Sequence, residues 1–307
     1  MKARVVITGA GGFVGQYMAG YLKQLQPAPH LIGVDISDSP AGSCDSFHKM
    51  DLSDNNAVAD IIARSRPDYI IHLAGVFGTD DQMEIYRVNV LSMIALLEAV
   101  RAFAPDAVVV AAGSAAEYGH VEPDQIPVTE QAPCRPVTAY GLSKLLATQV
   151  ALYYHRVFNT CVMVVRPFQL IGKGVTARLA PGAFAQQIEI VLSGRAQVIK
   201  VGNLDSSRDF LDVRDAAEAI WALCQKPAAG QVFNLCSGRL TKMSGLLDMM
   251  IDQCGQKVKV EADPARLRGK SDVSDISGSW QKLKDYCGWS PKRTLRESIS
   301  EMFAQER

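Results

Sequence analysis

Short apolar runs alternate with longer amphipathic segments along the first half of the chain. The runs are rich in Val and Ile and too short to form helices, which is typical of strands buried on both faces of a parallel sheet. They cover residues Arg4–Thr8, 30–34, 69–73, 107–111 and 161–165.

The segments between these runs carry hydrophobic residues at helical spacing. Val14, Met18, Leu22 and Leu25 recur on one face, and residues 91–103 repeat the pattern. The repeated order of strand, helix and strand predicts an α/β fold with a Rossmann-like, doubly wound parallel sheet.

The pattern loosens after residue 166, where Pro and Gly residues interrupt it. Helices and short strands are predicted there in turn, at 183–192, Val198–Val201, 215–225 and 231–235. We therefore expect a Rossmann domain over residues 1–166 and a smaller C-terminal α/β substrate-binding lobe over residues 167–307, with the two lobes interleaved.

Composition and charge narrow the class of protein. Of the 307 residues, 48% are hydrophobic and 21% are charged, which excludes a disordered or fibrous chain. The 32 basic residues balance the 32 acidic ones, so no global field draws the chain to nucleic acid or to a membrane surface. No apolar run approaches the roughly 20 residues needed to span a bilayer. We expect neither a nucleic acid nor a membrane partner.

The N-terminus and the cysteines indicate the compartment. Lys2 and Arg4 precede an apolar stretch, as in a signal peptide, but glycines interrupt that stretch, so no signal peptide is predicted. The seven cysteines are scattered, and none forms a C-x-x-C pair. This pattern favours reduced thiols over a disulfide framework or a zinc site. We expect a soluble cytoplasmic protein with no bound metal.

A glycine-rich segment joins the first predicted strand to the first predicted helix. Gly9 permits a tight turn, Gly12 lets the backbone approach a pyrophosphate, and Gly15 lets the helix pack on the strand. Phe13 and Val14 begin the helix, whose N-terminus offers unpaired N–H groups and the positive end of its dipole to phosphates. The segment predicts a dinucleotide-binding site.

Asp35 ends the next predicted strand, twenty residues after Gly15. A carboxylate at this place accepts hydrogen bonds from the adenosine ribose hydroxyls. It also repels a 2′-phosphate, and Ile36 and Ser37 follow it where an arginine would neutralise such a phosphate. NAD(H) is therefore favoured as the cofactor, and NADP(H) remains an alternative.

Three side chains further along are spaced for proton transfer. Tyr140 and Lys144 are one helical turn apart on the same face. An ammonium near a phenol stabilises phenolate, so we expect the pKa of Tyr140 to be lowered toward a useful range. Ser114 follows the predicted strand Val108–Ala112 at the carboxyl edge of the sheet, where such folds place their ligands.

With these motifs the chain resembles the extended short-chain dehydrogenase/reductase family, in its nucleotide-sugar-modifying branch. The resemblance covers nearly the whole chain. The matching motifs are the glycine segment 8–15, Asp51-Leu52, His72-Leu73-Ala74-Gly75, Asn89-Val90, Ser114 with Tyr118-Gly119, and Tyr140 with Lys144.

The resemblance implies a role for each of the three side chains. Tyr140 would be the acid/base, Ser114 would hydrogen-bond the reacting oxygen, and Lys144 would bind the nicotinamide ribose while tuning Tyr140. His72 is expected to be a packed strand residue and not a metal ligand. The implied cofactor-binding residues are Gly9, Gly12, Phe13, Val14, Gly15, Asp35, Asp51, Leu52, Leu73, Ala74, Gly75, Asn89 and Lys144.

The residues after Ser114 narrow the reaction within this family. The family's 4,6-dehydratases carry an acidic residue two places after their serine or threonine, and its GDP-fucose-forming epimerase-reductases carry a cysteine there. This chain has Ala116, which can do neither job, and the neighbouring Glu117 is expected to point elsewhere, with no role explained. The set that remains moves one hydride and one proton at a single carbonyl.

A later segment indicates the nucleotide. Residues 200–215 resemble the G-N-L-x-x-x-R-D segment of enzymes that act on GDP-mannose derivatives. Arginine binds phosphate oxygens bidentately, so Arg208 and Arg268 are the expected diphosphate partners, with Arg266 as the rival of Arg268. The family's R-x-F-N-x-x-G-P motif departs here to Gln169 and Lys173, so the substrate sits differently or is a related sugar. The expected substrate-binding residues are Gln169, Lys200, Gly202, Asn203, Arg208 and Arg268.

Taken together, the resemblance implies reduction of the C4 keto group of GDP-4-dehydro-6-deoxy-D-mannose to GDP-D-rhamnose, by hydride transfer from NAD(P)H. A nucleotide-sugar 4-epimerase with tightly bound NAD uses the same three side chains and stays open as an alternative. A catalytically inactive NAD(P)-sensing protein is a weaker alternative. The family also implies a homodimer, formed through helices that include residues 91–103 and 138–158.

Overall fold

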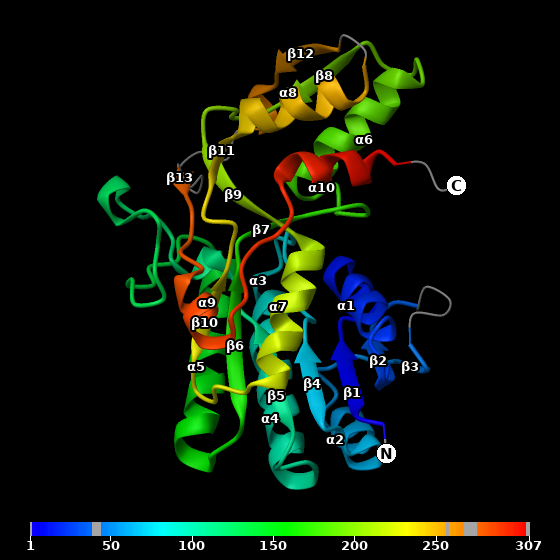
Figure 1. Cartoon of the computed structure of the whole chain (residues 1–307), viewed down its shortest axis with the longest axis vertical. Coiled ribbons are helices and arrows are strands. Elements are labelled where there is room, and N and C mark those ends of the chain that lie inside the picture. The colour runs from blue at the N-terminus through cyan, green and yellow to red at the C-terminus, as the bar shows by residue number, and fades with distance from the viewer. Residues whose placement is uncertain (1, 39–43, 256–257, 267–274, 305–307) are drawn as a thin grey trace.

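A parallel sheet of seven strands forms the lower part of the molecule in the computed structural model, which describes residues 2–38, 44–255, 258–266 and 275–304 (Figure 1). The strand order is β10-β6-β5-β4-β1-β2-β3, and every pair of neighbours is parallel. The doubly wound α/β fold predicted from the sequence is thereby confirmed. The strands are β1 (Arg4–Thr8), β2 (His30–Asp35), β3 (Ser46–Lys49), β4 (Tyr69–His72), β5 (Val108–Ala112), β6 (Val162–Pro167) and β10 (Val232–Leu235).

One face of the sheet is covered by α2 (Asn55–Ser65), α4 (Ser92–Phe103) and α5 (Ala139–Phe158), which share an apolar core with it. The helix expected at 91–103 is longer than its apolar pattern suggested. It begins as a π-helical turn, η1 (Arg87–Leu91), that runs directly into α4. The short helix α3 (Gln82–Tyr86) precedes this turn.

The opposite face of the sheet is covered by α1 (Phe13–Lys23), α7 (Val213–Gln225) and α9 (Gln281–Cys287). Leu22 and Leu283 are fully buried in this second apolar layer. Helices on both faces explain why the strands read as nearly continuous apolar runs. Within the described ranges, no helix is both long and apolar enough to cross a membrane.

A second lobe lies above the carboxyl ends of the parallel strands (Figure 1). It holds a sheet of four short strands, in which β7, β11 and β13 all pair with β9, and a separate parallel pair of β8 and β12. Its elements are β7 (Gln169–Ile171), α6 (Ala180–Leu192), β8 (Val198–Val201), β9 (Ser207–Asp212), β11 (Leu240–Lys242), α8 (Met243–Gln253), β12 (Lys259–Ala262), η4 (Pro264–Arg266), β13 (Asp275–Ile276) and α10 (Leu295–Met302).

The chain after residue 167 contributes to both lobes. The helix expected at 215–225 and the strand expected at 231–235 are present as α7 and β10, but both belong to the layers of the large sheet. β10 pairs with β6 at the sheet edge, because its apolar residues find a partner there. Residues 167–307 are therefore divided between the lobes, which sequence periodicity alone does not reveal.

A buried carboxylate ties the second lobe to the large sheet. Asp209 on β9 is fully buried and accepts hydrogen bonds from Ser237 N at 2.7 Å, Ser237 Oγ at 2.6 Å, Gly238 N at 2.9 Å and Gly278 N at 3.2 Å. These donors come from the turn after β10 and from the segment before α9. Burial raises the pKa of Asp209, and the hydrogen bonds from these donors act in the opposite direction. The donors also replace the water molecules that the carboxylate loses on burial.

Replacing Asp209 with Asn tests this link. The amide keeps one acceptor oxygen but points N–H groups at N–H donors, so we expect the free energy of unfolding to fall by roughly 2–3 kcal/mol. The control is Asp205→Asn, whose carboxylate is 91% exposed in its pair with Lys242. Urea titration of both variants measures the difference, and equal stability would contradict this role for Asp209.

Candidate active site

The glycine-rich turn after β1 is shaped by backbone contacts that exclude side chains. Gly9 has a φ of +70°, and a Cβ there would lie 2.8 Å from Ala74 N. A Cβ on Gly15 would lie 2.1 Å from the carbonyl oxygen of Gly9. Gly12 is the N-cap of α1 and has no side chain to bond the free N–H groups of Phe13 and Val14 or their successors. The turn thus leaves room and donors that fit a pyrophosphate, and the predicted dinucleotide site stays a prediction.

Asp35 lies beside this turn at the carboxyl end of β2. Its Oδ2 accepts a hydrogen bond from Gly11 N at 2.9 Å, and its Oδ1 accepts from Ser37 N at 2.9 Å and Ser37 Oγ at 2.8 Å. The carboxylate is only partly buried, so it remains accessible from the cleft side. This is the arrangement expected for binding a ribose diol next to the glycine turn.

Asp51 and Leu52 follow β3, one strand beyond Asp35 in the sheet. Asp51 forms an ion pair with Arg87 at 2.8 Å and accepts a hydrogen bond from Ser53 N at 2.9 Å, and Leu52 is buried. The pair joins the end of β3 to the π-helical turn. The structure therefore gives Asp51 a bracing function, and its predicted place beside the adenine stays a prediction.

Asn89 organises the loop that follows β4. Its Oδ1 accepts from Val76 N at 2.8 Å, and its Nδ2 donates to Val76 O at 3.0 Å and to Ser143 Oγ at 2.9 Å. The amide is thus fully used within the protein, and it clamps the loop containing Leu73, Ala74 and Gly75 against α5. The sequence left Asn89 as a cofactor-site candidate, and the structure gives it a positioning role.

The three candidate catalytic side chains meet at the carboxyl ends of β4 and β5. Ser114 is the N-cap of the 3₁₀ turn η2 (Ala115–Glu117), and its side chain is hydrogen-bonded to Tyr140. Tyr140 lies in the first turn of α5, whose N-cap is Thr138. Lys144 is 6% exposed and donates from Nζ to Ala112 O at 2.9 Å. The structure therefore brings together the three residues that the sequence singled out.

The pKa of Tyr140 differs from the expectation. Burial raises it and the charge of Glu117 acts in the same direction, while the hydrogen bond with Ser114 opposes both. The expected lowering by Lys144 does not appear, and its ammonium donates to Ala112 O at the carboxyl end of β5. Burial lowers the pKa of Lys144 to about 8, against the opposing charge of Glu117. Tyr140 is thus a proton donor at neutral pH.

His72 is a structural residue, in agreement with the sequence analysis. Its Nδ1 lies 2.7 Å from Thr8 Oγ1, and burial, aided by the charge of Lys144, lowers its pKa to about 3. The ring is therefore neutral at neutral pH. The part of the chain that the structure describes contains no cluster of His, Cys, Asp or Glu able to hold a metal ion.

Sequence reasoning missed Phe77 and Gly113 near Tyr140, and it expected Glu117 to point away from the cleft without finding a role for it. Glu117 is fully buried, and its Oε2 accepts from Arg166 Nε at 2.8 Å, which explains why it does not point into the cleft. Phe77 packs its ring edge-on to the Tyr140 ring, with centroids 6.0 Å apart. Gly113 leaves the space that Glu117 fills, because a Cβ at Gly113 would lie 2.3 Å from Glu117 Oε1.

The predicted substrate residues fall into two groups. Gln169 on β7 and Arg208 on β9 lie on paired strands, with Gln169 opposite Phe210, and Arg208 is half-buried. Lys200, Gly202 and Asn203 lie at the end of β8, in the separate two-stranded sheet. Arg268 lies outside the described residues.

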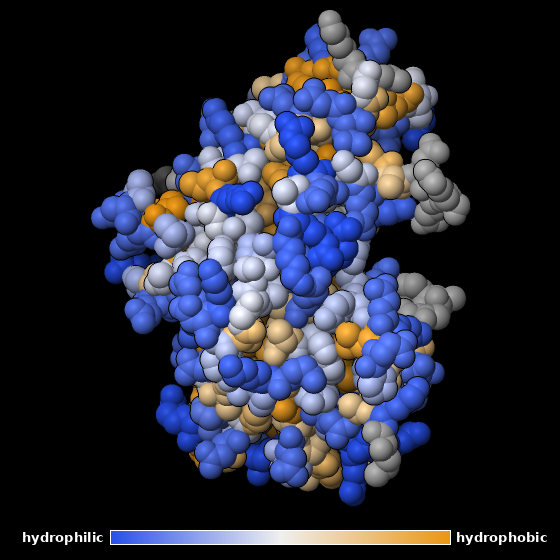
Figure 2. Space-filling view, viewed as in Figure 1, coloured by the Kyte–Doolittle hydropathy of each residue, from blue (hydrophilic) through white to orange (hydrophobic). Residues whose placement is uncertain are grey.

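The surface is hollowed between the sheet-bearing part and the second lobe, on the side of α1 and α10 (Figure 2). Two hydrogen bonds beside this hollow join the lobes, in addition to those of Asp209. Tyr17 OH on α1 donates to Lys173 O at 3.0 Å, and Arg178 Nη1 donates to Phe77 O at 3.4 Å in the loop over Tyr140. The glycine turn and the catalytic side chains thus lie at the sheet edge that the second lobe covers.

Comparisons with known proteins agree with this arrangement. The model of the NAD dependent epimerase/dehydratase family matches residues 5–236. GDP-6-deoxy-D-mannose reductase of Pseudomonas aeruginosa is 31% identical over 304 residues, covering 97% of this chain and 95% of the relative. dTDP-6-deoxy-L-talose 4-dehydrogenase (NAD(P)(+)) of Kitasatospora kifunensis is 26% identical, covering 99% and 96%. The solved structure of RMD from Pseudomonas aeruginosa complexed with NADPH is similar at a TM-score of 0.85 and 29% identity, covering 98% of each chain.

The packing of Gly15 generates a prediction about cofactor binding. Gly15→Ala forces α1 away from Gly9 O, so we expect the affinity for NADH to fall at least about tenfold, since helix and turn hold the pyrophosphate jointly. Gly20→Ala, on the same helix, is the control because nothing lies within 4 Å of its added Cβ. It should bind NADH normally. Fluorescence titration measures both affinities, and normal binding by Gly15→Ala would contradict the prediction.

Proposed function

Since the chain belongs to the NAD dependent epimerase/dehydratase family, we propose that it reduces the C4 keto group of GDP-4-dehydro-6-deoxy-D-mannose to GDP-D-rhamnose with NAD(P)H. The observation that carries the proposal is a site with one acid/base. Tyr140 is available, whereas Ala116 has no ionisable group and Glu117 is buried in its pair with Arg166. A single carbonyl reduction requires no more than this. The reductase that is 31% identical over nearly the whole chain supports the same reaction.

The chain's own residues fit a nicotinamide cofactor. The glycine turn offers the pyrophosphate a cradle that a Cβ would fill, and Asp35 offers a carboxylate to the adenosine ribose. When bound, the cofactor supplies the hydride that reduces the carbonyl carbon. We propose that NADH is preferred to NADPH, because Asp35 places negative charge where a 2′-phosphate would lie.

Proton delivery falls to the side chains on η2 and α5. Ser114 holds the carbonyl oxygen of the sugar through its hydroxyl, and Tyr140 donates its proton to that oxygen as the hydride arrives at the carbon. Lys144 lies one helical turn beyond Tyr140 on α5, and its role is to bind the nicotinamide ribose. The ketone thereby gains one hydride and one proton and becomes a secondary alcohol.

Substrate recognition is proposed for the second lobe. Arg208 is placed on β9 with its guanidinium partly buried, and such a group binds the oxygens of a diphosphate in pairs. Gln169 on the adjacent strand offers an amide to the sugar. Lys200, Gly202 and Asn203 are proposed as further contacts at the nucleotide end.

The experiment that tests the function combines a spectroscopic assay with product analysis. The purified protein is mixed with GDP-4-dehydro-6-deoxy-D-mannose and either NADH or NADPH, and the loss of reduced nicotinamide absorbance is followed. We expect coenzyme oxidation, faster with NADH, and GDP-D-rhamnose by NMR. No oxidation, together with NAD⁺ retained by the purified protein, would contradict the proposal and indicate a nucleotide-sugar 4-epimerase.

In that same assay Tyr140→Phe removes the proton donor. We expect turnover to fall by roughly 10²–10⁴-fold, as is typical of a positioned acid, with NADH affinity nearly unchanged. Tyr153→Phe is the matched control on the same helix, since Tyr153 is 44% exposed and remote from the site. Full activity of Tyr140→Phe would remove Tyr140 from the mechanism.

A homodimer is also proposed, through the outer face of α4 and α5. Large apolar side chains are exposed along this face, namely Leu91, Phe103, Leu142, Leu146, Tyr153, Val157 and Phe158. Burying this row against a second copy removes it from water. Sedimentation velocity should give a dimer for the natural chain and a monomer for Leu146→Glu. Leu240→Glu, at another exposed apolar position, is the control that should stay dimeric, and a monomeric natural chain would refute the interface.

A further inference from the structure

Glu117 and Arg166 form an ion pair inside the protein, beside the catalytic side chains. Their side chains are 0% and 5% exposed, and Arg166 Nε donates to Glu117 Oε2 at 2.8 Å. Burying two charges is costly unless the pair is well aligned and its remaining polar atoms are bonded. A pair in this place therefore needs an explanation beyond general stability, since apolar residues of similar volume would often be at least as stable.

The carboxylate of Glu117 is bonded on both oxygens. Beyond Arg166, its Oε1 accepts from Ser114 N at 2.9 Å and from Thr148 Oγ1 at 3.1 Å. The bond to Ser114 N completes a capping box, in which Ser114 in turn caps the turn that ends at Glu117. Glu117 thus fixes the backbone from which the Ser114 hydroxyl reaches Tyr140.

The surrounding backbone leaves room for this carboxylate. A Cβ on Gly113 would lie 2.3 Å from Glu117 Oε1, and a Cβ on Gly141 would lie 2.5 Å from Ala116 O. Two glycines therefore let η2 sit close to β5 and to the first turn of α5. The close approach places the charge of Glu117 near the hydroxyl of Tyr140 and the ammonium of Lys144, and it acts on both.

Arg166 is held from its other side by a polar network. Its Nη1 donates to Tyr118 OH at 3.1 Å, and its guanidinium lies 4.8 Å above the Tyr118 ring. Tyr118 OH donates to Asn234 Oδ1 at 2.7 Å, and Asn234 N donates to Glu130 Oε1 at 2.8 Å. Every partner sits on a strand or a tight turn, so the guanidinium has one place to lie.

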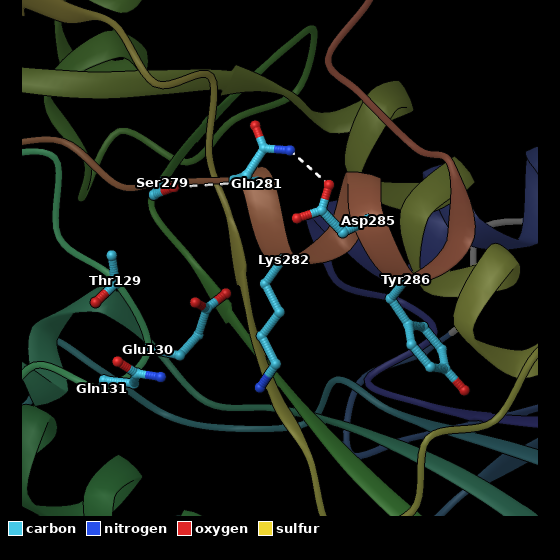
Figure 3. Close-up of a pocket in the computed structure, with 8 residues that line it drawn as sticks. All are labelled: Thr129, Glu130, Gln131, Ser279, Gln281, Lys282, Asp285 and Tyr286. Atoms are coloured by element: carbon cyan, nitrogen blue, oxygen red, sulfur yellow. Dashed lines mark hydrogen bonds between the residues drawn. The ribbon is translucent and has the colours of Figure 1, made fainter.

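The network ends at a surface groove next to the edge strand β10. The groove has a volume of about 520 Å³, and Figure 3 shows the side chains of Glu130 and Lys282 next to one another among the residues that line it. Lys282 Nζ donates to Val232 O at 2.8 Å and so caps the exposed edge of β10. The groove and Ser114 lie at opposite ends of this hydrogen-bond network. The network therefore connects the ion pair to the edge strand β10 and not to the cleft.

We propose that Glu117 and Arg166 act as a positioning unit for the active site, in which Glu117 fixes Ser114 and supplies the negative charge that faces Tyr140 and Lys144. The inference rests on the proposed function for its substrate, but neither residue needs to touch that substrate. Arg166 keeps the carboxylate turned inward and away from the reacting sugar.

The charge of Glu117 has a definite sign of effect. The titratable and charged groups that face it are Arg166 on β6, Tyr140 and Lys144 on α5, and Cys134 in the loop before α5. Burial is the main cause of the raised pKa of Tyr140 and of the lowered pKa of Lys144. The charge of Glu117 raises the pKa of both groups. Removing that charge lowers both, so the protonated forms needed for reduction disappear at a lower pH.

The variant that tests this inference is Glu117→Gln, which keeps the size and one acceptor oxygen for Ser114 N but removes the charge. We expect kcat to fall by roughly tenfold to a hundredfold, as for a misplaced reacting group, with the KM for NADH within about twofold. The alkaline limb of the kcat profile should move to lower pH by roughly half a unit or more. An unchanged kcat, or an unmoved alkaline limb, would overturn the proposal.

Asp215→Asn is the matched control for loss of a buried ion pair. Asp215 is fully buried, pairs with Arg293 and accepts from the backbone N of Lys292 and Arg293, but it lies on α7 and away from the site. It should lose stability as Glu117→Gln does, without any shift of the pH profile. A shift of the same size in Asp215→Asn would show that the effect is structural and overturn the proposal.

A milder variant decides the question should Glu117→Gln fail to fold. Thr148→Val preserves shape and the charge of Glu117 but removes one donor to Oε1. We expect kcat to fall several-fold with the alkaline limb unmoved, because positioning is loosened while the charge remains. Natural kcat in Thr148→Val would overturn the positioning role.

A substrate-free measurement separates this inference from the proposed function. In protein with isotope-labelled lysine, the NMR signal of Lys144 should titrate at lower pH in Glu117→Gln than in the natural chain. In Asp215→Asn it should titrate at the same pH as in the natural chain. That result supports the positioning unit even if the natural chain fails to reduce the GDP-sugar. Identical titration in Glu117→Gln and the natural chain would overturn it, whatever the substrate.

Discussion

The carboxyl ends of β1, β4 and β5 are tied together by side chains, and the rest of the site depends on this constraint. Beyond the last paired residues of these strands, the backbone groups need partners outside the strand pairing. Lys144 bonds Ala112 O, Asn89 brackets Val76, and Thr8 bonds His72. The side chains at this end of the sheet thereby hold the cleft in shape, and one of them, Lys144, is also proposed to take part in the reaction.

The path of the second half of the chain gives this edge its cover. After β6 the chain leaves the sheet for the second lobe, returns through α7 and β10, leaves again for β11 and α8, and comes back with α9. Repeated crossings restrict the motion of the lobe as a separate body. Asp209 and Tyr17 add polar ties at two of these crossings. The separation of the proposed diphosphate site from the glycine turn is therefore set by the fold itself.

The sequence predicted what depends on local pattern. The strands, the helix periodicity, the glycine turn and the Tyr140–Lys144 spacing are each contained within a few residues, and their bounds agree with the structure to within a few positions. The place of β10 and α7 depends on which sheet they join, and the pairing of Glu117 with Arg166 spans 49 positions, so neither leaves a local trace. The predicted direction of the Tyr140 pKa shift was also wrong, because the shift depends mainly on burial, which residue spacing does not reveal.

The position of one carboxylate illustrates why adjacency in sequence misleads about chemistry. Residues 116 and 117 are neighbours, yet the 3₁₀ turn of about three residues brings the third residue after Ser114 back beneath its backbone, where Glu117 bonds Ser114 N. Position 116 instead lies on the turn itself, with Ala116 N bonded to Ser114 Oγ. An acid at 117 therefore serves the protein interior, and neither of these two positions offers an ionisable group to the cleft. This agrees with the proposed chemistry at one carbonyl, for which Tyr140 is the proposed proton donor, while the choice of sugar is proposed for the second lobe.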